Sequence, residues 1–335
     1  MVVLWRRGPR HGHQLGWDTE ETVGSFKKYP AQDEGTAVRG VFVQPDKLRA
    51  AVIGCFGQAV SKPMESNNEF RSNYGKWAMV TGASSGIGRA MVQELAKVGL
   101  NLVLVARREA ELKQLAAEMS ASHGVQTRVL SADLSIRNEV QRIEKETFDL
   151  DIGLLVAAAG FGTSGDFIDA NLEDELSMLD VNCRAVMELS LHFGRRLVKR
   201  GGGGMILFGS LVGYQGTPRA AHYAATKAYV QTFAEGLHLE LAPMGVHVLA
   251  SAPGPVLSGF GKRAKMQMGL AEKPERVARA TLAALGKRMT VTPGVVSKFL
   301  TWSLMTAPRG LRVRIMGRIM GGMTRPREGL RSRWT

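Results

Sequence analysis

Short apolar segments alternate with helical segments from residue 76 onward, and this alternation constrains the fold more strongly than any other feature of the sequence. The first apolar segment, "KWAMVT", runs into a glycine-rich turn and then into the helical pattern "GRAMVQELAKVG". Strands that read as continuous apolar runs are covered on both faces, as in a parallel sheet. With right-handed crossovers, the pattern predicts the α/β class, as a single Rossmann-type, doubly wound parallel sheet with helices on both faces.

About seven strands are expected, and the loops that follow them should carry the functional residues. Ligands of an open α/β sheet bind beyond the carboxyl ends of its strands. The strand segments are "KWAMVT", "NLVLVA", "VQTRVLS", "IGLLVAAA", "GMILFGS", "GVHVLASA" and "RMTVT". The helices are expected over residues 88–99, 109–122, 135–147, 173–199, 220–242 and 274–285.

The alternation also divides the chain into three parts. Residues 1–73 show no sustained periodicity and are rich in Gly, Pro and charge, so we expect a poorly ordered, irregular extension. Residues 74–293 carry the alternation and form the expected α/β domain, and residues 294–335 form a basic and apolar tail. Met64 is an alternative start, in which case residues 1–63 would be a translation artefact or a disposable extension. Mass spectrometry of the native N-terminus would test this.

The net charge of +14 is concentrated at the C-terminal end, where residues 262–335 hold 17 Lys or Arg and 3 Asp or Glu. Such a segment can meet an anionic membrane surface or nucleic acid, or can remain a solvated surface. No recognition motif accompanies it, so we expect no nucleic-acid partner. No apolar run reaches about 18 residues, which argues against a spanning helix. Because the only cysteines are Cys55 and Cys183, we expect a cytoplasmic protein without a disulfide framework.

The loop after the first strand, "TGASSGIG", predicts dinucleotide binding. Gly82, Gly86 and Gly88 allow the backbone to approach a pyrophosphate at the N-terminus of the next helix, where N–H groups favour anions. The spacing differs from the commoner G-x-G-x-x-G and tight structural turns also use glycine, but the position after the first strand favours the cofactor. The expected cofactor contacts are Thr81, Gly82, Ser84, Ser85, Gly86, Ile87 and Gly88.

The next two loops bear on the choice of cofactor. Arg107 and Arg108 follow the second strand, where an acidic residue would bind the 2′-hydroxyl of NAD and an Arg accommodates the 2′-phosphate of NADP. We therefore expect NADP(H) in preference to NAD(H), the alternative being an ordinary cationic helix start. Asp133, after the third strand, could accept a hydrogen bond from the adenine amine, with Ser135 as the helix cap.

Three residues near the fifth loop suit hydride-transfer chemistry. Tyr223 and Lys227 lie four residues apart, on one face of a helix, and Ser210 ends the preceding strand segment. A carbonyl that accepts a hydride needs a proton, which Tyr223 could donate. The Lys227 charge would lower the phenol pKa, and Ser210 would hydrogen-bond the carbonyl oxygen. An isolated Tyr-x3-Lys is an ordinary surface pair, but Ser210 and the glycine loop favour catalysis.

With these motifs in place, residues 74–292 resemble the short-chain dehydrogenase/reductase superfamily. The resemblance places the catalytic roles on Ser210, Tyr223 and Lys227, with Lys227 also binding the nicotinamide ribose. It adds Asn182, in "LDVNCRA", as support for a water-mediated proton relay to the lysine. The further cofactor contacts that it implies are Leu134, Ala158, Ala159, Gly160, Tyr223, Pro253, Gly254, Val256 and Ser258.

One motif departs from the family pattern. The family usually has "NNAG" after the fourth strand, and residues 157–160 here read "AAAG", which affects local stability more than chemistry because no catalytic side chain is lost. The segment "YGKWAMVTGASSGIG" also looks like the branch of hydroxysteroid and long-chain 3-oxoacyl reductases. The implied activity is NADP(H)-dependent interconversion of a carbonyl and an alcohol. The alternative is a non-catalytic regulator or scaffold that keeps the fold and binds the cofactor.

Substrate and partner expectations also follow from the resemblance. Residues 255–272 would form a mobile lid over the substrate. The expected substrate contacts are Ser210, Tyr214, Phe161, Phe260 and Met266, which suit an apolar, lipid-like, 3-oxoacyl or steroid-like molecule. No metal site is expected. The tail could lie on a membrane surface, or pack over the active site or a partner subunit. The family implies a homodimer or homotetramer through the helices at 173–199 and 220–242.

Overall fold

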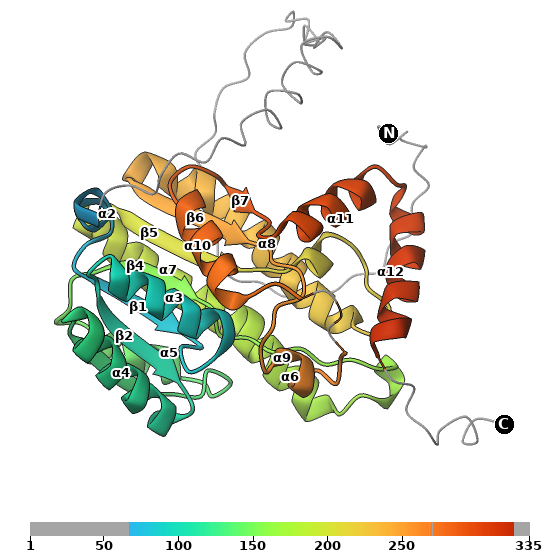
Figure 1. Cartoon of the computed structure of the whole chain (residues 1–335), viewed down its shortest axis with the longest axis horizontal. Helices are drawn as coiled ribbons and strands as arrows, with labels where there is room; N and C mark the ends of the chain where they lie inside the picture. The colour runs from blue at the N-terminus through green and yellow to red at the C-terminus, as the bar shows by residue number, and fades with distance from the viewer. Residues whose placement is uncertain (1–66, 268, 270, 325–335) are drawn as a thin grey trace, which may run out of the picture. The chain divides into compact units, whose positions relative to one another are not determined.

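The computed structural model describes residues 67–267, 269 and 271–324 of the 335-residue chain. One parallel sheet runs through this part, in the order β3-β2-β1-β4-β5-β6-β7 (Figure 1). The strands are β1 (Trp77–Thr81), β2 (Asn101–Ala106), β3 (Thr127–Ser131), β4 (Ile152–Ala157), β5 (Gly203–Phe208), β6 (Val246–Ser251) and β7 (Thr290–Val291). The order reverses between β1 and β4, so the ligand site of an open α/β sheet is expected beyond these two strands. The predicted seven-stranded, doubly wound fold is confirmed.

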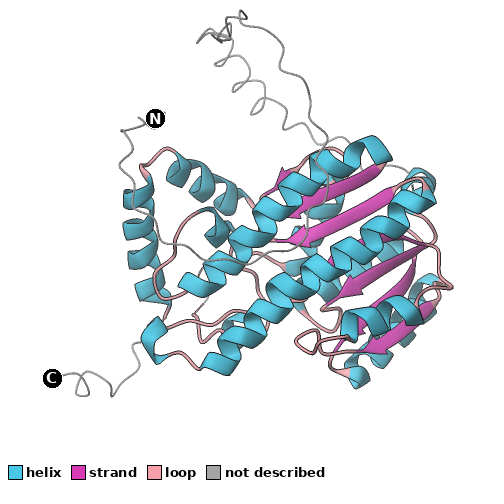
Figure 2. Cartoon of the chain, turned by 180° about the vertical axis from the view of Figure 1, so that it is seen from behind, coloured by secondary structure: helices cyan, strands magenta, loops and turns pink. Residues whose placement is uncertain are grey.

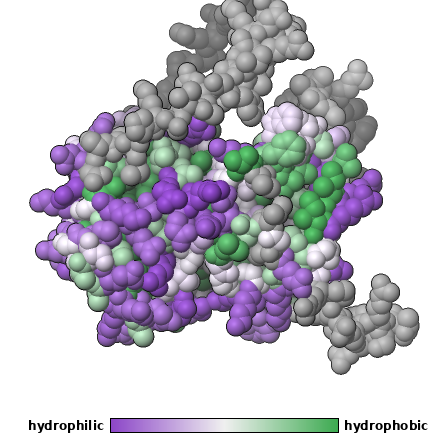
Figure 3. All heavy atoms as spheres, in the orientation of Figure 1, coloured by the Kyte–Doolittle hydropathy of each residue, from purple (hydrophilic) through white to green (hydrophobic). Residues whose placement is uncertain are grey.

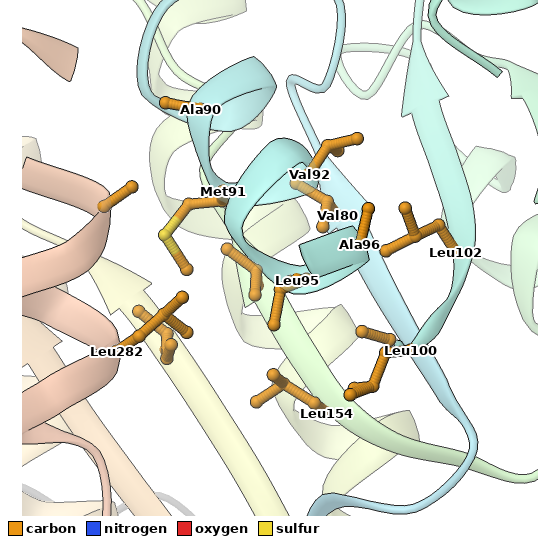
Figure 4. Packing of buried hydrophobic residues seen from close by; sticks show 14 of the residues in the cluster. Val80, Ala90, Met91, Val92, Leu95, Ala96, Leu100, Leu102, Leu154 and Leu282 are labelled. Atoms are coloured by element: carbon orange, nitrogen blue, oxygen red, sulfur yellow. The ribbon is translucent and has the colours of Figure 1, made fainter. Parts of the chain in front are cut away.

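Helices cover both faces of the sheet (Figure 2). One layer contains α3 (Gly86–Lys97), α4 (Glu109–His123) and α10 (Pro274–Ala284), and the other contains α5 (Glu139–Glu146), α7 (Ala185–Arg200) and α8 (Ala221–Leu241). Met91 and Leu95 of α3 pack between the strands and Leu282 of α10 (Figure 4). On the opposite face, Ile143 and Phe193 are fully buried. Because both faces are packed, the loops beyond the strand ends stand on a rigid base.

Helix α2 (Asn67–Tyr74) lies within the stretch that we expected to be an irregular extension, and it packs on the sheet. Phe70 and Tyr74 are buried in the same cluster as α3, with ring centroids 4.6 Å apart. The Tyr74 hydroxyl lies 3.0 Å from Nδ1 of His247 on β6. A Cβ on Gly204 of β5 would lie 2.8 Å from the Tyr74 ring, so glycine provides the space for it. The ordered domain therefore includes residues 67–73, while Met64, Cys55 and the rest of residues 1–66 lie outside the described residues.

The single helix expected over residues 173–199 is interrupted. It consists of α6 (Leu172–Leu179), one π-helical turn, η2 (Asp180–Arg184), and α7. A π turn holds an extra residue and shifts the faces of the helix that follows it, and such turns are frequent at functional sites. This one contains Asn182.

The helix expected from Ser135 begins at Glu139 instead. Asp133 accepts hydrogen bonds from the backbone N–H and the hydroxyl of Ser135, at 3.0 and 2.8 Å, which holds a turn. Asn138 occupies the N-cap position in a left-handed conformation, with φ at 72°. Ser135 is therefore not the cap, because its polar groups bind Asp133.

The C-terminal tail forms two helices, α11 (Val295–Met305) and α12 (Arg309–Met323), joined by residues 306–308. Residue 297 of α11 packs against the loop after β6, where a Cβ on Gly254 would collide with the Ser297 hydroxyl. Figure 1 shows both helices beside the carboxyl ends of the strands. The short α9 (Phe260–Arg263) packs near α12, where Phe260 and Met320 belong to one cluster. None of the helices in the described part of the chain combines the length and apolar character needed to cross a bilayer.

Candidate active site

The glycine loop between β1 and α3 leaves room only for backbone. Gly82 and Gly86 have positive φ angles of 68° and 55°, which other residues adopt at a cost. A Cβ on Gly82 would meet the backbone of Ala159 at 2.9 Å, and one on Gly88 would collide with the carbonyl of Gly82. The loop enters the N-terminus of α3, whose first N–H groups have no partner within the helix. This cradle fits a pyrophosphate.

Two arginines stand beside the glycine loop at the end of β2. Arg108 donates a hydrogen bond from Nη2 to Ser84 Oγ at 3.0 Å, and Nη1 of Arg107 lies 3.6 Å from Oδ2 of Asp133. Burial acts to raise the pKa of Asp133, but hydrogen bonds from Ser135 and the charge of Arg107 outweigh it, and the pKa is lowered. Both guanidinium groups are about half exposed, so each can still meet an anionic group.

Ser210, Tyr223 and Lys227 converge on one cavity. Ser210 lies between β5 and the short turn η3 (Leu211–Tyr214), and the other two project from the first two turns of α8. Tyr223 and Lys227 are buried. The Lys227 Nζ donates a hydrogen bond to the Phe208 carbonyl at 2.8 Å and lies 6.0 Å from the centroid of the Tyr223 ring. The structure thus brings together the three residues that the sequence singles out.

Burial is the main influence on the pKa values of Tyr223 and Lys227. Burial raises the pKa of the Tyr223 phenol, and a hydrogen bond with Ser210 acts against it only in part. Burial lowers the pKa of Lys227 to about 8, with an opposing effect of Cys183. The net rise of the phenol pKa comes from burial, and the lowering that we expected from the Lys227 charge stays a prediction. A phenol with a raised pKa keeps its proton at neutral pH and remains a proton donor.

Apolar side chains supply this desolvation. Tyr223 is buried in a cluster with Phe161, Met178 and Met320, and its ring centroid lies 5.3 Å from that of Phe260. These residues come from the loop after β4, from α6, from α12 and from α9. The reacting end of the cavity is thus closed by segments that are far apart in the sequence.

Asn182 lies behind the cavity wall and holds the loop after β4. Its Oδ1 accepts a hydrogen bond from the Phe161 N–H at 3.1 Å, and its Nδ2 donates to the Phe161 carbonyl at 2.9 Å and to Thr226 Oγ1 at 3.0 Å. A Cβ on Gly160 would lie 2.9 Å from the Asn182 Oδ1 and 3.3 Å from the Lys227 Nζ. Asn182 therefore ties the β4 loop to α8, close to the lysine.

A cavity of about 530 Å³ connects the glycine loop, the two arginines and the catalytic candidates. Every expected cofactor contact other than Thr81 borders it, as do Ser210, Phe161, Phe260 and Met266 among the expected substrate contacts. The glycine loop, the N-terminus of α3 and the two arginines lie at one end of the cavity. Tyr223 and Lys227 lie at the other end. These residues fit a nicotinamide dinucleotide.

Three expected site residues do not border the cavity. Thr81 lies beneath the β4 loop, where its hydroxyl accepts a hydrogen bond from the Ala159 N–H at 3.1 Å. Tyr214 ends η3 and is half-buried, with its hydroxyl bonded to Thr292. Asn182 is fully buried, as described above. Thr81 and Asn182 thus position the loop that borders the cavity, and the role of Tyr214 as a substrate contact stays a prediction.

Packing of the tail over the active site was one of the expected alternatives, but no residue of α11 or α12 was predicted as a cavity contact. Leu300 of α11 borders the cavity together with a row on α12: Met316, Ile319, Met320 and Met323. This row repeats at intervals of three and four residues, which is the helical signal that could have identified it. Arg263 of α9 also borders the cavity, with its guanidinium 3.7 Å from the centroid of the Phe161 ring.

Known proteins resemble this chain in both sequence and structure. A family model described as "short chain dehydrogenase" matches residues 76–269, more than half of the chain. A 7beta-hydroxysteroid dehydrogenase of Clostridium sardiniense is 34% identical over 233 residues, covering 68% of this chain and 89% of that protein. A very-long-chain 3-oxoacyl-CoA reductase of Anas platyrhynchos is 31% identical over 277 residues, covering 81% and 85% of the two chains.

Among solved structures, a short-chain dehydrogenase from Sphingobium yanoikuyae in complex with NADPH superposes with a TM-score of 0.62. It is 29% identical, and the match covers 70% of this chain and 96% of that chain. The part of the chain that contains the glycine loop, Ser210, Tyr223 and Lys227 is the part that these proteins share.

Proposed function

Because this chain belongs to the short-chain dehydrogenase family, we propose that it is an NADP(H)-dependent oxidoreductase that interconverts an apolar ketone and its alcohol. The family acts on CH–OH and C=O groups with a nicotinamide cofactor. The main support for the proposal is that Ser210, Tyr223 and Lys227 converge on the apolar end of a cavity. The glycine loop borders the other end of the same cavity.

Arg107 and Arg108 support the choice of NADP(H). They stand at the end of β2, where the adenosine ribose of a dinucleotide is held in this type of fold. Two half-exposed guanidinium groups would bind a 2′-phosphate by charge-assisted hydrogen bonds. A similar short-chain dehydrogenase has been solved in complex with NADPH.

The catalytic residues would divide the work on the carbonyl as follows. The nicotinamide supplies the hydride in the direction of reduction. The Ser210 hydroxyl would donate a hydrogen bond to the carbonyl oxygen, and Tyr223 would release its proton to that oxygen as charge develops. Lys227, an ammonium ion below about pH 8, would stabilise the phenolate that remains. Asn182 would act as a positioning residue, since it holds the β4 loop and not the substrate.

The reacting end of the cavity supports an apolar substrate. Phe161, Phe260 and Met266 border it together with the methionine row of α12, and methionines adapt to irregular apolar shapes. The names of the relatives, a hydroxysteroid dehydrogenase and a very-long-chain 3-oxoacyl-CoA reductase, refer to large apolar substrates. We include in the proposal a cytoplasmic location, peripheral contact of the tail with a membrane, and a homodimer or homotetramer.

A substrate panel tests the proposal. The full-length protein is given NADPH with steroid ketones, long-chain 3-oxoacyl thioesters and small polar aldehydes, and loss of the near-ultraviolet absorbance of NADPH is followed. We expect turnover of the large apolar ketones well above that of the small aldehydes. A non-catalytic regulator would bind NADPH and turn over nothing, and turnover restricted to the polar aldehydes would contradict the apolar assignment.

A further inference from the structure

The hairpin of α11 and α12, which we call the C-terminal hairpin (residues 295–323), has two different faces. Its inner face borders the cavity through Leu300 of α11 and the row of Met316, Ile319, Met320 and Met323 on α12. Met316 and Met320 are almost fully buried. The inner face thus forms part of the wall at the reacting end of the cavity.

The outer face of α11 is apolar and exposed. Val295, Phe299 and Trp302 recur at intervals of four and three residues and are 79%, 67% and 54% exposed. The rings of Phe299 and Trp302 lie 6.3 Å apart between centroids, so they form one patch. Met305 and Leu311, on either side of the turn, are also exposed. Figure 3 shows hydrophobic residues gathered over α11 and α12.

Positive charge surrounds this patch. Residues 294–324 contain five Lys or Arg and no Asp or Glu. Lys298 stands beside the aromatic pair on α11, and Arg309, Arg314 and Arg318 of α12 are exposed. Aromatic residues flanked by basic ones on a helix that lies parallel to a surface are typical of contact with anionic lipid.

The hairpin is also connected to the substrate lid. Met266 forms an antiparallel bridge with Thr324, and the Gln267 N–H donates to the Met323 carbonyl at 2.8 Å. At its base, the lid is fixed by a parallel bridge between Val256 and Glu272. The lid segment that borders the cavity is therefore bonded to the C-terminal end of α12.

We propose that the outer face of the C-terminal hairpin docks on an anionic lipid bilayer, from which the apolar substrate passes beneath the hairpin into the cavity. The inference rests on the proposed function for its substrate. Lipid, and not a second copy of the chain, is the expected occupant of this face. A two-fold contact through it would bring the Lys and Arg residues of both copies together. The docking requires no spanning helix, only helices that lie in the bilayer interface.

Vesicle binding of the full-length protein tests the docking. Pelleting is compared for phosphatidylcholine vesicles and for vesicles of equimolar phosphatidylcholine and phosphatidylglycerol. We expect binding to the anionic vesicles that weakens with added salt. Arg314→Gln/Arg318→Gln should lose roughly fivefold in affinity for each cation removed. Phe299→Ser/Trp302→Ser should weaken binding to the anionic vesicles through lost apolar insertion.

Matched controls come from the two residues that flank α5, which lie outside the hairpin and do not border the cavity. Arg137→Gln and Phe148→Ser remove an exposed cation and an exposed aromatic ring there, and should bind vesicles as the wild type does. Equal pelleting on both vesicle types, or hairpin variants that pellet like the wild type, would overturn the docking. Hairpin variants that change the sedimentation of the protein without lipid, and not its vesicle binding, would assign the face to a protein contact instead.

Turnover separates this inference from the proposed function. A ketone of the apolar class that is soluble in water should be reduced equally by the wild type and by both hairpin variants, whereas the same class of ketone embedded in anionic vesicles should be reduced more slowly by the variants. Wild-type protein that binds vesicles but reduces no ketone would reject the proposed function and leave the docking standing. Equal rates on the embedded ketone would reject substrate transfer from the bilayer.

Discussion

Loss of hydration is the dominant physical effect on the two titratable groups of the site. The Tyr223 phenol lies among apolar residues from four segments and holds its proton, while Lys227 holds its proton less firmly than in water. The lowered pKa of Lys227 also affects the stability of the fold. A buried ammonium that is protonated at neutral pH costs free energy, and that cost falls as the lysine loses its proton.

The pH dependence of stability tests the state of Lys227. Its pKa is about 8 in the folded chain, against an ordinary value of 10.5. Between these values the unfolded chain binds a proton that the folded chain has released, so raising the pH stabilises the fold. We expect the free energy of unfolding of the wild type to rise relative to Lys227→Met by at most about 1.4 kcal/mol per pH unit above pH 8.

Urea denaturation of both proteins at a series of pH values measures this difference. Below about pH 8 the difference should be constant, because Lys227 is then protonated in both states. Parallel curves across the whole range would show that the lysine titrates as it does in water.

The proposed preference for NADP(H) can be tested at a single residue. In Arg107→Asp, a carboxylate replaces the guanidinium beside Asp133 and would repel a 2′-phosphate while offering an acceptor to a ribose hydroxyl. We expect the ratio of NADPH to NADH affinity to fall by about tenfold or more, corresponding to about 1.4 kcal/mol from one lost charge-assisted hydrogen bond. Arg89→Asp, at a cation that pairs with Glu118, is the control for a change of charge. A ratio that does not move would assign Arg107 to the helix start alone.

At the scale of the elements, the π turn between α6 and α7 connects fold and site. It buries Asn182 so that one side chain satisfies both backbone polar groups of Phe161 and also contacts α8 through Thr226. In Asn182→Ala the Phe161 groups lose their partners in a buried position. We expect a loss of about 2–4 kcal/mol in the free energy of unfolding.

Thr226→Val is the matched comparison for Asn182→Ala, since it leaves the two Phe161 bonds in place and should cost less. Thermal or urea unfolding measures both variants, and the rate of ketone reduction should fall further in Asn182→Ala than in Thr226→Val. Equal stability of the two variants would indicate that the Phe161 loop does not depend on Asn182.

The sequence was sufficient for features with a local signal, and insufficient for those set by long-range packing. The doubly wound parallel sheet follows from the apolar strands and their alternation with helices, and Ser210, Tyr223 and Lys227 were singled out by their spacing. The hydrogen bond of Tyr214 with Thr292 could not be predicted, because the direction of a side chain in a short turn depends on neighbours that are distant in the sequence. The α12 row has a helical period, but its position over the cavity depends on contacts between segments about 60 residues apart, from Phe260 to Met320.

At the scale of the whole molecule, the exposed apolar residues of α6 and α7 bear on the proposed oligomer. Leu172, Leu176 and Leu179 recur at intervals of four and three residues, and Leu191 of α7 is also exposed. Such a stripe is typical of a surface that a partner covers. These are the helices through which the family resemblance implies that subunits associate.

A charge on this stripe should separate the subunits. We expect Leu176→Arg/Leu191→Arg to sediment as a monomer in velocity ultracentrifugation, because a second copy would have to bury unpaired guanidinium groups. Phe148→Arg, at a more exposed apolar residue outside α6 and α7, should sediment as the wild type does. A double variant with unchanged sedimentation would place the subunit contact elsewhere.

The proposed mechanism depends on Tyr223 as the source of the proton for carbonyl reduction at the apolar end of this cavity. The most direct measurement compares NADPH consumption by the wild type and by Tyr223→Phe, on the best ketone of the panel, together with NADPH binding followed by fluorescence. We expect the variant to bind NADPH as the wild type does and to lose its turnover by at least about a hundredfold, the scale of one general acid. Turnover that persists in Tyr223→Phe, at a comparable rate and with NADPH bound, would contradict this mechanism.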